Sequence, residues 1–183
     1  MFQELLEKIA QALDTAGIAY MVIGGQAVLV YGEPRLTRDI DITLGASTDR
    51  LADILALSGR IGLSARVKDE ADFVDRTMVL PCEHPQTGIR VDFIFSWSVY
   101  EQQALQRTRE VKLGKTIVRF ASLEDLIVHK IIAGRPRDLE DVRIVLLKNP
   151  YADADYIRRW LKDFQDTTNE PYLIRFKEVW DQR

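Results

Sequence analysis

The most informative stretch of the sequence is Ile23-Gly24-Gly25, followed after thirteen intervening residues by Asp39-Ile40-Asp41-Ile42. An apolar run typical of a strand leads into the two glycines, and a helix-like segment follows at 26–31. Glycines at a strand-to-helix junction let the backbone approach a phosphate, which then faces the free N–H groups of the helix N-terminus. Gly24 and Gly25 are therefore candidates for binding the phosphate of a nucleotide, and the alternative is a turn that uses glycine for purely conformational reasons.

Asp39 and Asp41 alternate with two isoleucines, which is the period of a β-strand. In a strand both carboxylates lie on one face and both isoleucines on the other. Two close carboxylates repel each other and lose solvation unless a cation lies between them. Hard divalent ions suit such a pair, above all Mg²⁺ shared with substrate phosphates. The alternative for this pattern is a solvated strand face without chemistry.

A third carboxylate, Asp92, occurs on a later segment with the same alternation. Residues 77–82 and 89–95 are predicted to form a hairpin around the turn 85–88. In the second strand Asp92 shares a face with Arg90, and apolar side chains occupy the other face. Three carboxylates from neighbouring strands are the arrangement that two-metal phosphoryl or nucleotidyl transfer needs.

From Ser122 onward the sequence predicts only helices. Ser122 opens a variant of the capping box, and the helix that it starts runs to Gly134. Pro136 can occupy the first position of the next helix. Two further amphipathic helices are expected at about 153–164 and 172–180.

Several charged residues near the start and end of these segments have two open interpretations. Lys130 lies one helical turn before Gly134, and Arg137 follows just beyond. These cations either contact a triphosphate or are basic residues favoured by the dipole of a helix C-terminus. Asp138 is either a site residue or an ordinary charge at a helix N-terminus. Arg38, before the aspartate strand, either binds phosphate or offsets the repulsion of the carboxylates.

Composition places the chain among ordinary globular proteins. It has 183 residues, of which 46% are hydrophobic and 29% charged. No apolar run approaches the roughly 18 residues of a membrane span, and the N-terminus lacks the layout of a signal peptide. The lone Cys82 cannot form an internal disulfide. We therefore expect a cytoplasmic protein with no membrane partner.

The charge distribution is compatible with a metal site and a phosphate site. The net charge of −3 argues against a nucleic-acid footprint over the whole surface. Residues 1–100 carry −5, however, and residues 101–183 carry +2. A basic helix face is either solvated or a contact for tRNA or another polyanion; it comprises Arg158, Arg159 and Lys162.

In combination these motifs resemble the DNA polymerase beta-like nucleotidyltransferase superfamily. The residues that carry the resemblance are Ile23-Gly24-Gly25, Asp39-Ile40-Asp41-Ile42 and Val91-Asp92-Phe93. The stretch from Leu123 through Lys130 to Asp141 narrows it to AbiEii-type nucleotidyltransferases of abortive-infection and toxin–antitoxin systems. The resemblance covers roughly residues 18–145, and the helices after about residue 149 match nothing.

The resemblance implies an α/β (α+β) fold with a short, mixed, twisted sheet flanked by helices at 1–120. A helical C-terminal region, 121–183, would pack on it. By analogy Asp39 and Asp41 bind metal, Asp92 completes the site and helps activate the acceptor, and Lys130 contacts the triphosphate. Asp138 is the acidic residue that follows.

The implied reaction is transfer of a nucleoside monophosphate from an NTP to an acceptor hydroxyl, with Mg²⁺ or Mn²⁺ as cofactor. The tRNA 3′ end is the leading acceptor, and a cognate antitoxin is a further expected partner. Other functions stay open: a small-molecule acceptor such as an aminoglycoside, a protein acceptor, or a module that binds nucleotide or protein without turnover. A structural domain with solvated aspartates is the remaining alternative.

Overall fold

The computed structural model describes residues 2–34, 36–37, 39–96 and 98–183. The chain forms two compact units. The first comprises the described residues of 1–26 and 37–120, and the second comprises those of 27–36 and 121–183. The first unit contains the sheet, and the second is helical.

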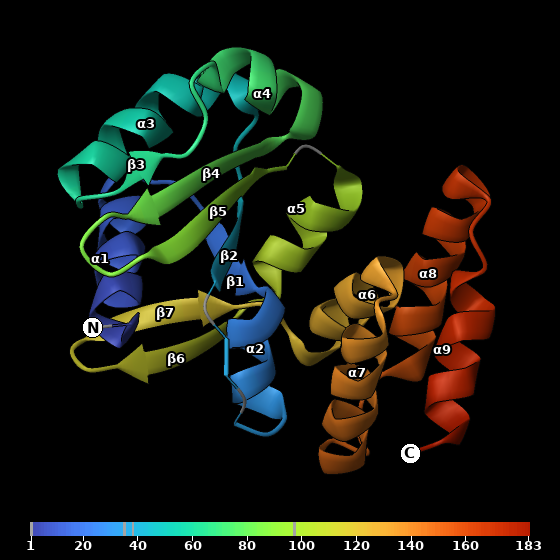
Figure 1. Cartoon of the computed structure of the whole chain (residues 1–183). Helices are drawn as coiled ribbons and strands as arrows, with labels where there is room; N and C mark the ends of the chain where they lie inside the picture. Colours follow the sequence, from blue (N-terminus) through green and yellow to red (C-terminus); the bar gives the residue numbers. More distant parts are fainter. Residues whose placement is uncertain (1, 35, 38, 97) are drawn as a thin grey trace. The chain divides into compact units, whose positions relative to one another are not determined.

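Within the described residues, seven strands form one mixed sheet in the order β3-β4-β5-β2-β1-β7-β6 (Figure 1). The pairs β2–β5 and β1–β7 are parallel, and the other neighbours are antiparallel. The strands are β1 (Tyr20–Ile23), β2 (Asp39–Leu44), β3 (Ser64–Ala65), β4 (Val79–His84), β5 (Ile89–Phe95), β6 (Arg109–Leu113) and β7 (Thr116–Phe120).

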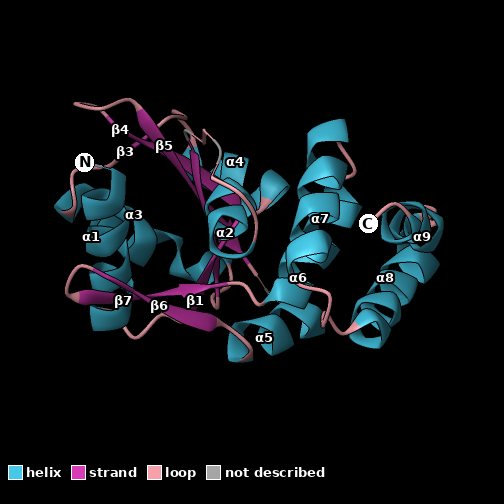
Figure 2. Cartoon of the chain, turned by 90° about the horizontal axis from the view of Figure 1, so that it is seen from below, coloured by secondary structure: helices cyan, strands magenta, loops and turns pink. Residues whose placement is uncertain are grey.

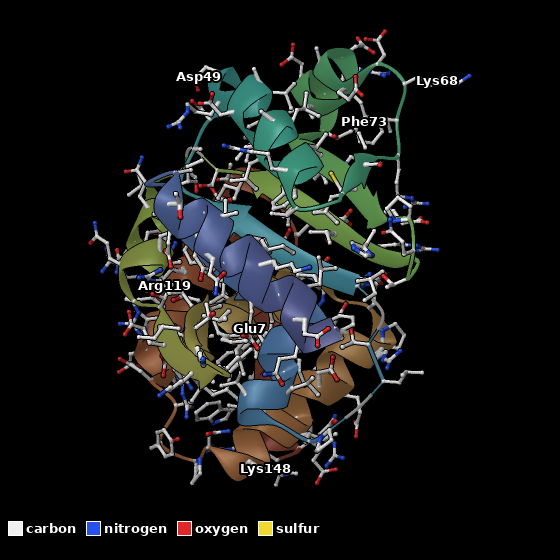
Figure 3. The ribbon with its side chains drawn as sticks, turned by 90° about the vertical axis from the view of Figure 1, so that its left-hand side faces the viewer. Glu7, Asp49, Lys68, Phe73, Arg119 and Lys148 are labelled. Carbon is white, nitrogen blue, oxygen red and sulfur yellow. The ribbon has the colours of Figure 1, made fainter. Side chains whose placement is uncertain are left out.

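Helix α1 (Phe2–Thr15) covers part of the sheet over β7 (Figure 3). It buries one apolar stripe because its leucines and isoleucine recur at helical spacing. Gly17 ends it in the left-handed conformation (φ +62°), and the N–H of Ile18 then donates to the carbonyl of Leu13. Arg119 on β7 donates to Asp14 at 2.5 Å and so ties the strand to the helix.

The remaining helices of the first unit are α3 (Leu51–Arg60), α4 (Glu70–Thr77) and α5 (Val99–Gln106), and a 3₁₀ turn (Thr48–Arg50) precedes α3. Ser98 caps α5 with a complete capping box, because its hydroxyl accepts from the N–H of Glu101 while the Glu101 carboxylate accepts from the N–H of Ser98.

The second unit consists of most of α2 (Gly24–Tyr31) together with α6 (Leu123–Ala133), α7 (Pro136–Lys148), α8 (Ala154–Thr168) and α9 (Tyr172–Asp181). The last four helices lie side by side in both views (Figures 1 and 2). Polar contacts fix α2 within this unit, since the Tyr31 hydroxyl donates to the carbonyl of Ala121 at 2.9 Å. The Asn149 amide donates to the carbonyl of Tyr31 at 2.8 Å.

The structure confirms the predicted fold class and most predicted elements. Ser122 caps α6, Gly134 (φ +62°) ends it, and Pro136 occupies the first turn of α7. One strand was misplaced, because Thr77 belongs to α4 and β4 begins only at Val79. Helix α2, predicted within the 1–120 domain, lies mostly in the helical unit. None of the helices in the described residues has the length and apolar character that crossing a bilayer requires.

Candidate active site

The register between β2 and β5 brings three carboxylates to one face of the sheet. Asp41 is the direct partner of Asp92, and Asp39 is the partner of Arg90. Partners in a parallel ladder point to the same face, as do residues two apart in one strand. All three aspartates are half-buried. The opposite face of the same segments is fully buried and consists of Ile40, Ile42, Val91 and Phe93.

The surroundings of Asp92 perturb its ionisation. Its burial raises the pKa of the carboxyl above the ordinary 3.8, and the negative charge of Asp39 raises it further. The positive charges of Arg66 and Arg90 act in the opposite direction without cancelling the increase. A bound cation would lower this pKa, so the site favours positive charge.

The Asp41 carboxylate packs closely against Gly24. The glycine is left-handed (φ +62°), and a Cβ at this position would overlap Oδ2 of Asp41. The carboxylate therefore lies against the first residue of α2, where the partial positive charge of a helix N-terminus favours an anion. The sequence predicts a phosphate-binding role for the glycine pair, and the structure adds this contact with a predicted metal ligand.

The carboxylate oxygens of these aspartates are ligands of the kind that a hard divalent cation prefers. Carboxylate oxygens from β2 and from the neighbouring β5 share one half-buried face, and burial together with the charge of Asp39 raises the pKa of Asp92. In the described part of the chain, no three His, Cys, Asp or Glu side chains are gathered closely enough to enclose an ion by themselves. Mg²⁺ completes its coordination with waters and substrate phosphates, so a partial protein shell is compatible with it.

The second group of predicted site residues forms a buried ion cluster in the helical unit. Nζ of Lys130 donates to Asp138 at 2.6 Å and to Asp141 at 2.8 Å. These three side chains are 5–7% exposed. Nε of Arg135 also donates to Asp138, at 2.6 Å. Burial alone would raise the pKa of Asp138, but hydrogen bonds and charge from Lys130 and Arg135 together hold it below its ordinary value.

The other predicted nucleotide-binding residues are less constrained. Arg137 is exposed, and its Nη2 donates to the carbonyl of Leu36 at 3.1 Å. Gly25 follows Gly24 in the first turn of α2. Arg38 lies outside the described residues.

The sequence placed Arg90 on the same face as Asp92 without a role, and it did not place Arg66 near Asp92. Arg90 could have been assigned, because it precedes Asp92 by two residues in one strand and shares its face. Arg66 could not, because it follows the two-residue strand β3 in a segment without periodicity. Its backbone N–H donates to the carbonyl of Pro81, which is the cross-strand partner of Asp92.

Comparison with protein families shows what kind of protein this is. A family model described as "Nucleotidyl transferase AbiEii toxin, Type IV TA system" matches residues 9–181. The chain belongs to this AbiEii family. It is thus a member of a family of nucleotidyltransferase enzymes. No curated protein matches the sequence significantly.

Solved structures with the same fold include antibiotic nucleotidyltransferases. The solution structure of the antibiotic-resistance factor ANT(2″)-Ia aligns with a TM-score of 0.62 at 17% identity, over 90% of this chain and 91% of that one. The lincomycin-bound lincosamide antibiotic adenylyltransferase LnuA aligns with a TM-score of 0.57 at 16% identity, over 78% and 94% of the two chains. At these identities the similarity shows a shared fold.

We expect Gly24→Ala to lower activity about 100-fold, because displacing the Asp41 carboxylate by even 1 Å misaligns the reaction. Gly17→Ala is the matched control, since Gly17 has the same φ of +62° but no neighbour within 4 Å of an added Cβ. Both variants should lose about 1–2 kcal/mol of stability through backbone strain. Nucleotidyl transfer and thermal unfolding measure the two effects. Equal activity in the two variants would contradict the contact.

In metal-free protein, ¹³C NMR titration should give Asp92 a pKa above 3.8, and Asp39→Asn should move that pKa downward. The reason is that Asp39 supplies part of the charge that raises it. The exposed carboxylate Asp49 provides the control, because Asp49→Asn should leave the pKa of Asp92 in place. An unchanged Asp92 pKa in Asp39→Asn would show that the two carboxylates do not interact.

We expect Lys130→Met to lower the free energy of unfolding by about 3–5 kcal/mol at pH 7, because it removes the buried cation that Asp138 and Asp141 share. Lys148→Met, which removes a half-exposed cation 3.3 Å from Glu33, should cost less than about 1 kcal/mol. Urea unfolding measures both.

The cost of Lys130→Met should also depend on pH. Since the pKa of Asp138 is depressed in the folded state, its contribution is present above about pH 4 and is lost as the pH falls through that lowered pKa. A cost that does not shrink on acidification, or that equals the cost of Lys148→Met, would contradict the buried cluster.

Proposed function

We propose that this AbiEii-family chain transfers a nucleoside monophosphate from an NTP to an acceptor hydroxyl, with Mg²⁺ (or Mn²⁺) held by Asp39, Asp41 and Asp92. One observation carries the proposal. The β2–β5 register pairs Asp41 with Asp92 and puts all three carboxylates on one half-buried face. Such a face is costly without a cation and suited to one.

In the proposed reaction, the acceptor oxygen forms a bond to the α-phosphorus, the bond from that phosphorus to the bridging oxygen breaks, and pyrophosphate leaves. The bound metal would stabilise the charge that develops in this in-line displacement. Asp92, the strand partner of Asp41 on the same face, would take the proton of the acceptor hydroxyl, whose own pKa the bound metal would lower.

Nucleotide binding is assigned to Gly24, Gly25, Arg38, Lys130 and Arg137, and Asp138 is assigned to the same site through its contact with Lys130. Among the described residues, Asp138 and Asp141 are the acceptors of the Lys130 ammonium. An ammonium has three N–H donors, so one of them remains for a phosphate oxygen. In this proposal Asp138 holds Lys130 in place rather than contacting the nucleotide.

For the acceptor, the toxin-family membership favours a nucleic acid, and we propose the 3′ end of tRNA, with an antitoxin as cognate partner and the cytoplasm as compartment. A small-molecule acceptor is the second candidate, because a protein of similar fold, ANT(2″)-Ia, has been solved with adenylyl-2″-tobramycin (TM-score 0.61, 18% identity).

The proposal is tested by incubating the protein with Mg²⁺ and each of the four α-³²P-labelled NTPs. Total tRNA, protein and a panel of aminoglycosides and lincosamides serve as acceptors. We expect the label to reach one acceptor class, and Asp39→Asn with Asp41→Asn to abolish the transfer. If tRNA is the acceptor, periodate oxidation of its 3′ end should block labelling.

The matched control is Asp49→Asn with Asp53→Asn, which removes the same charge from exposed positions and should leave transfer intact. Transfer that survives in the Asp39/Asp41 double variant would overturn the assignment of these carboxylates. Absence of any labelled acceptor, together with absence of NTP binding, would overturn the proposed function.

A further inference from the structure

Arg175 on α9 binds the end of α6. Its Nη1 donates to the carbonyl of Ile131 at 2.7 Å and to that of Ile132 at 3.4 Å. Carbonyls in the last turn of a helix lack intrahelical donors, and a positive charge is favoured there by the helix dipole. Arg175 therefore supplies both a donor and a charge that α6 needs at its C-terminus.

The turn after α6 is shaped to admit this guanidinium. Gly134 ends α6 with φ +62°, and a Cβ on Gly134 would overlap Nη1 and Cζ of Arg175. The guanidinium also lies over the ring of Tyr172, with Cζ 5.5 Å from the ring centroid. Glycine is thus required at 134 for two reasons, its backbone conformation and the approach of Arg175.

The same turn carries the ion cluster of the helical unit. Lys130 lies in the last turn of α6, Arg135 is the N-cap of α7, and Asp138 lies in the first turn of α7. The hydrogen bonds from Lys130 and Arg135 to Asp138 hold the two helices together from inside the turn. Arg175 adds a link from α9 to the end of α6.

We propose that Arg175 is a positioning residue for NTP binding. By fixing the end of α6 it sets the place of Lys130 and of the residues that follow Gly134, and it contacts no nucleotide itself. This inference rests on the proposed function, in which Lys130 contacts the triphosphate. The proposal also assigns α9 a role, that of holding the end of α6, which the sequence did not predict.

The test compares Arg175→Met with Lys177→Met in the full-length protein. Lys177 lies on the same helix, is 76% exposed and pairs with Asp181, so this control removes an equal charge from the surface. We expect Arg175→Met to raise the KM for the NTP about tenfold with kcat nearly unchanged, the signature of lost ground-state binding. Arg175→Lys should recover part of the loss, and Lys177→Met should behave as wild type.

Amide hydrogen exchange supplies a readout that does not depend on activity. The N–H of Gly134, which donates to the carbonyl of Lys130, and the N–H of Asp138, which donates to that of Arg135, should exchange faster in Arg175→Met. If Arg175 only capped α6, Arg175→Met would accelerate this exchange but leave the KM for the NTP unchanged. That result would overturn the proposal. Unchanged exchange would overturn it as well.

A double-mutant cycle with Gly134→Ala separates the contact from general loss of stability. Gly134→Ala should raise the KM more in the wild-type background than in Arg175→Met, because backbone strain at Gly134 is common to both backgrounds and the overlap with the guanidinium occurs only in the first. Additive effects would show that the two residues act independently and would contradict the proposal. If the wild type neither transfers nor binds nucleotide, the proposed function fails; if the wild type is active and Arg175→Met matches it, this inference alone fails.

Discussion

The parallel pairing of β2 with β5 is the constraint on which the candidate site depends. A shift of one residue in a strand moves every side chain to the opposite face. Here the register is fixed by the buried face, where Ile40, Ile42, Val91 and Phe93 are 0% exposed. The apolar core thereby determines that Asp41 faces the same side as Asp92. The free energy gained by burying the apolar side chains offsets the repulsion between these carboxylates.

The buried and half-buried carboxylates of the two units have opposite electrostatic surroundings. On the sheet, burial and the negative charge of Asp39 together raise the pKa of Asp92 in spite of two nearby arginines. In the helical unit, Lys130 and Arg135 balance Asp138 and Asp141, and the pKa of Asp138 is lowered. Carboxylates crowded in this way are typical of sites for cations or proton transfer, whereas the ion pairs of the second unit join α6 to α7.

The sequence predicted the elements whose patterns are local. The alternation around Asp39 and Asp41, the cap at Ser122 and the stop at Gly134 each follow from spacing within one segment. The positions that depend on distant partners could not be predicted in this way. No local pattern places Arg66 near Asp92, packs Asp41 against Gly24 or brings Arg175 to the end of α6, because these contacts join segments far apart in sequence.

In the proposed function, Asp39, Asp41 and Asp92 hold a divalent ion together with a nucleotide. The most direct measurement is a crystal structure of the protein with Mn²⁺ and a non-hydrolysable NTP, in which anomalous scattering locates the metal. We expect anomalous density in contact with carboxylate oxygens of β2 and β5 and with phosphate oxygens, and its loss in Asp41→Asn. Mn²⁺ and nucleotide bound away from these strands, or bound equally well in Asp41→Asn, would contradict the account.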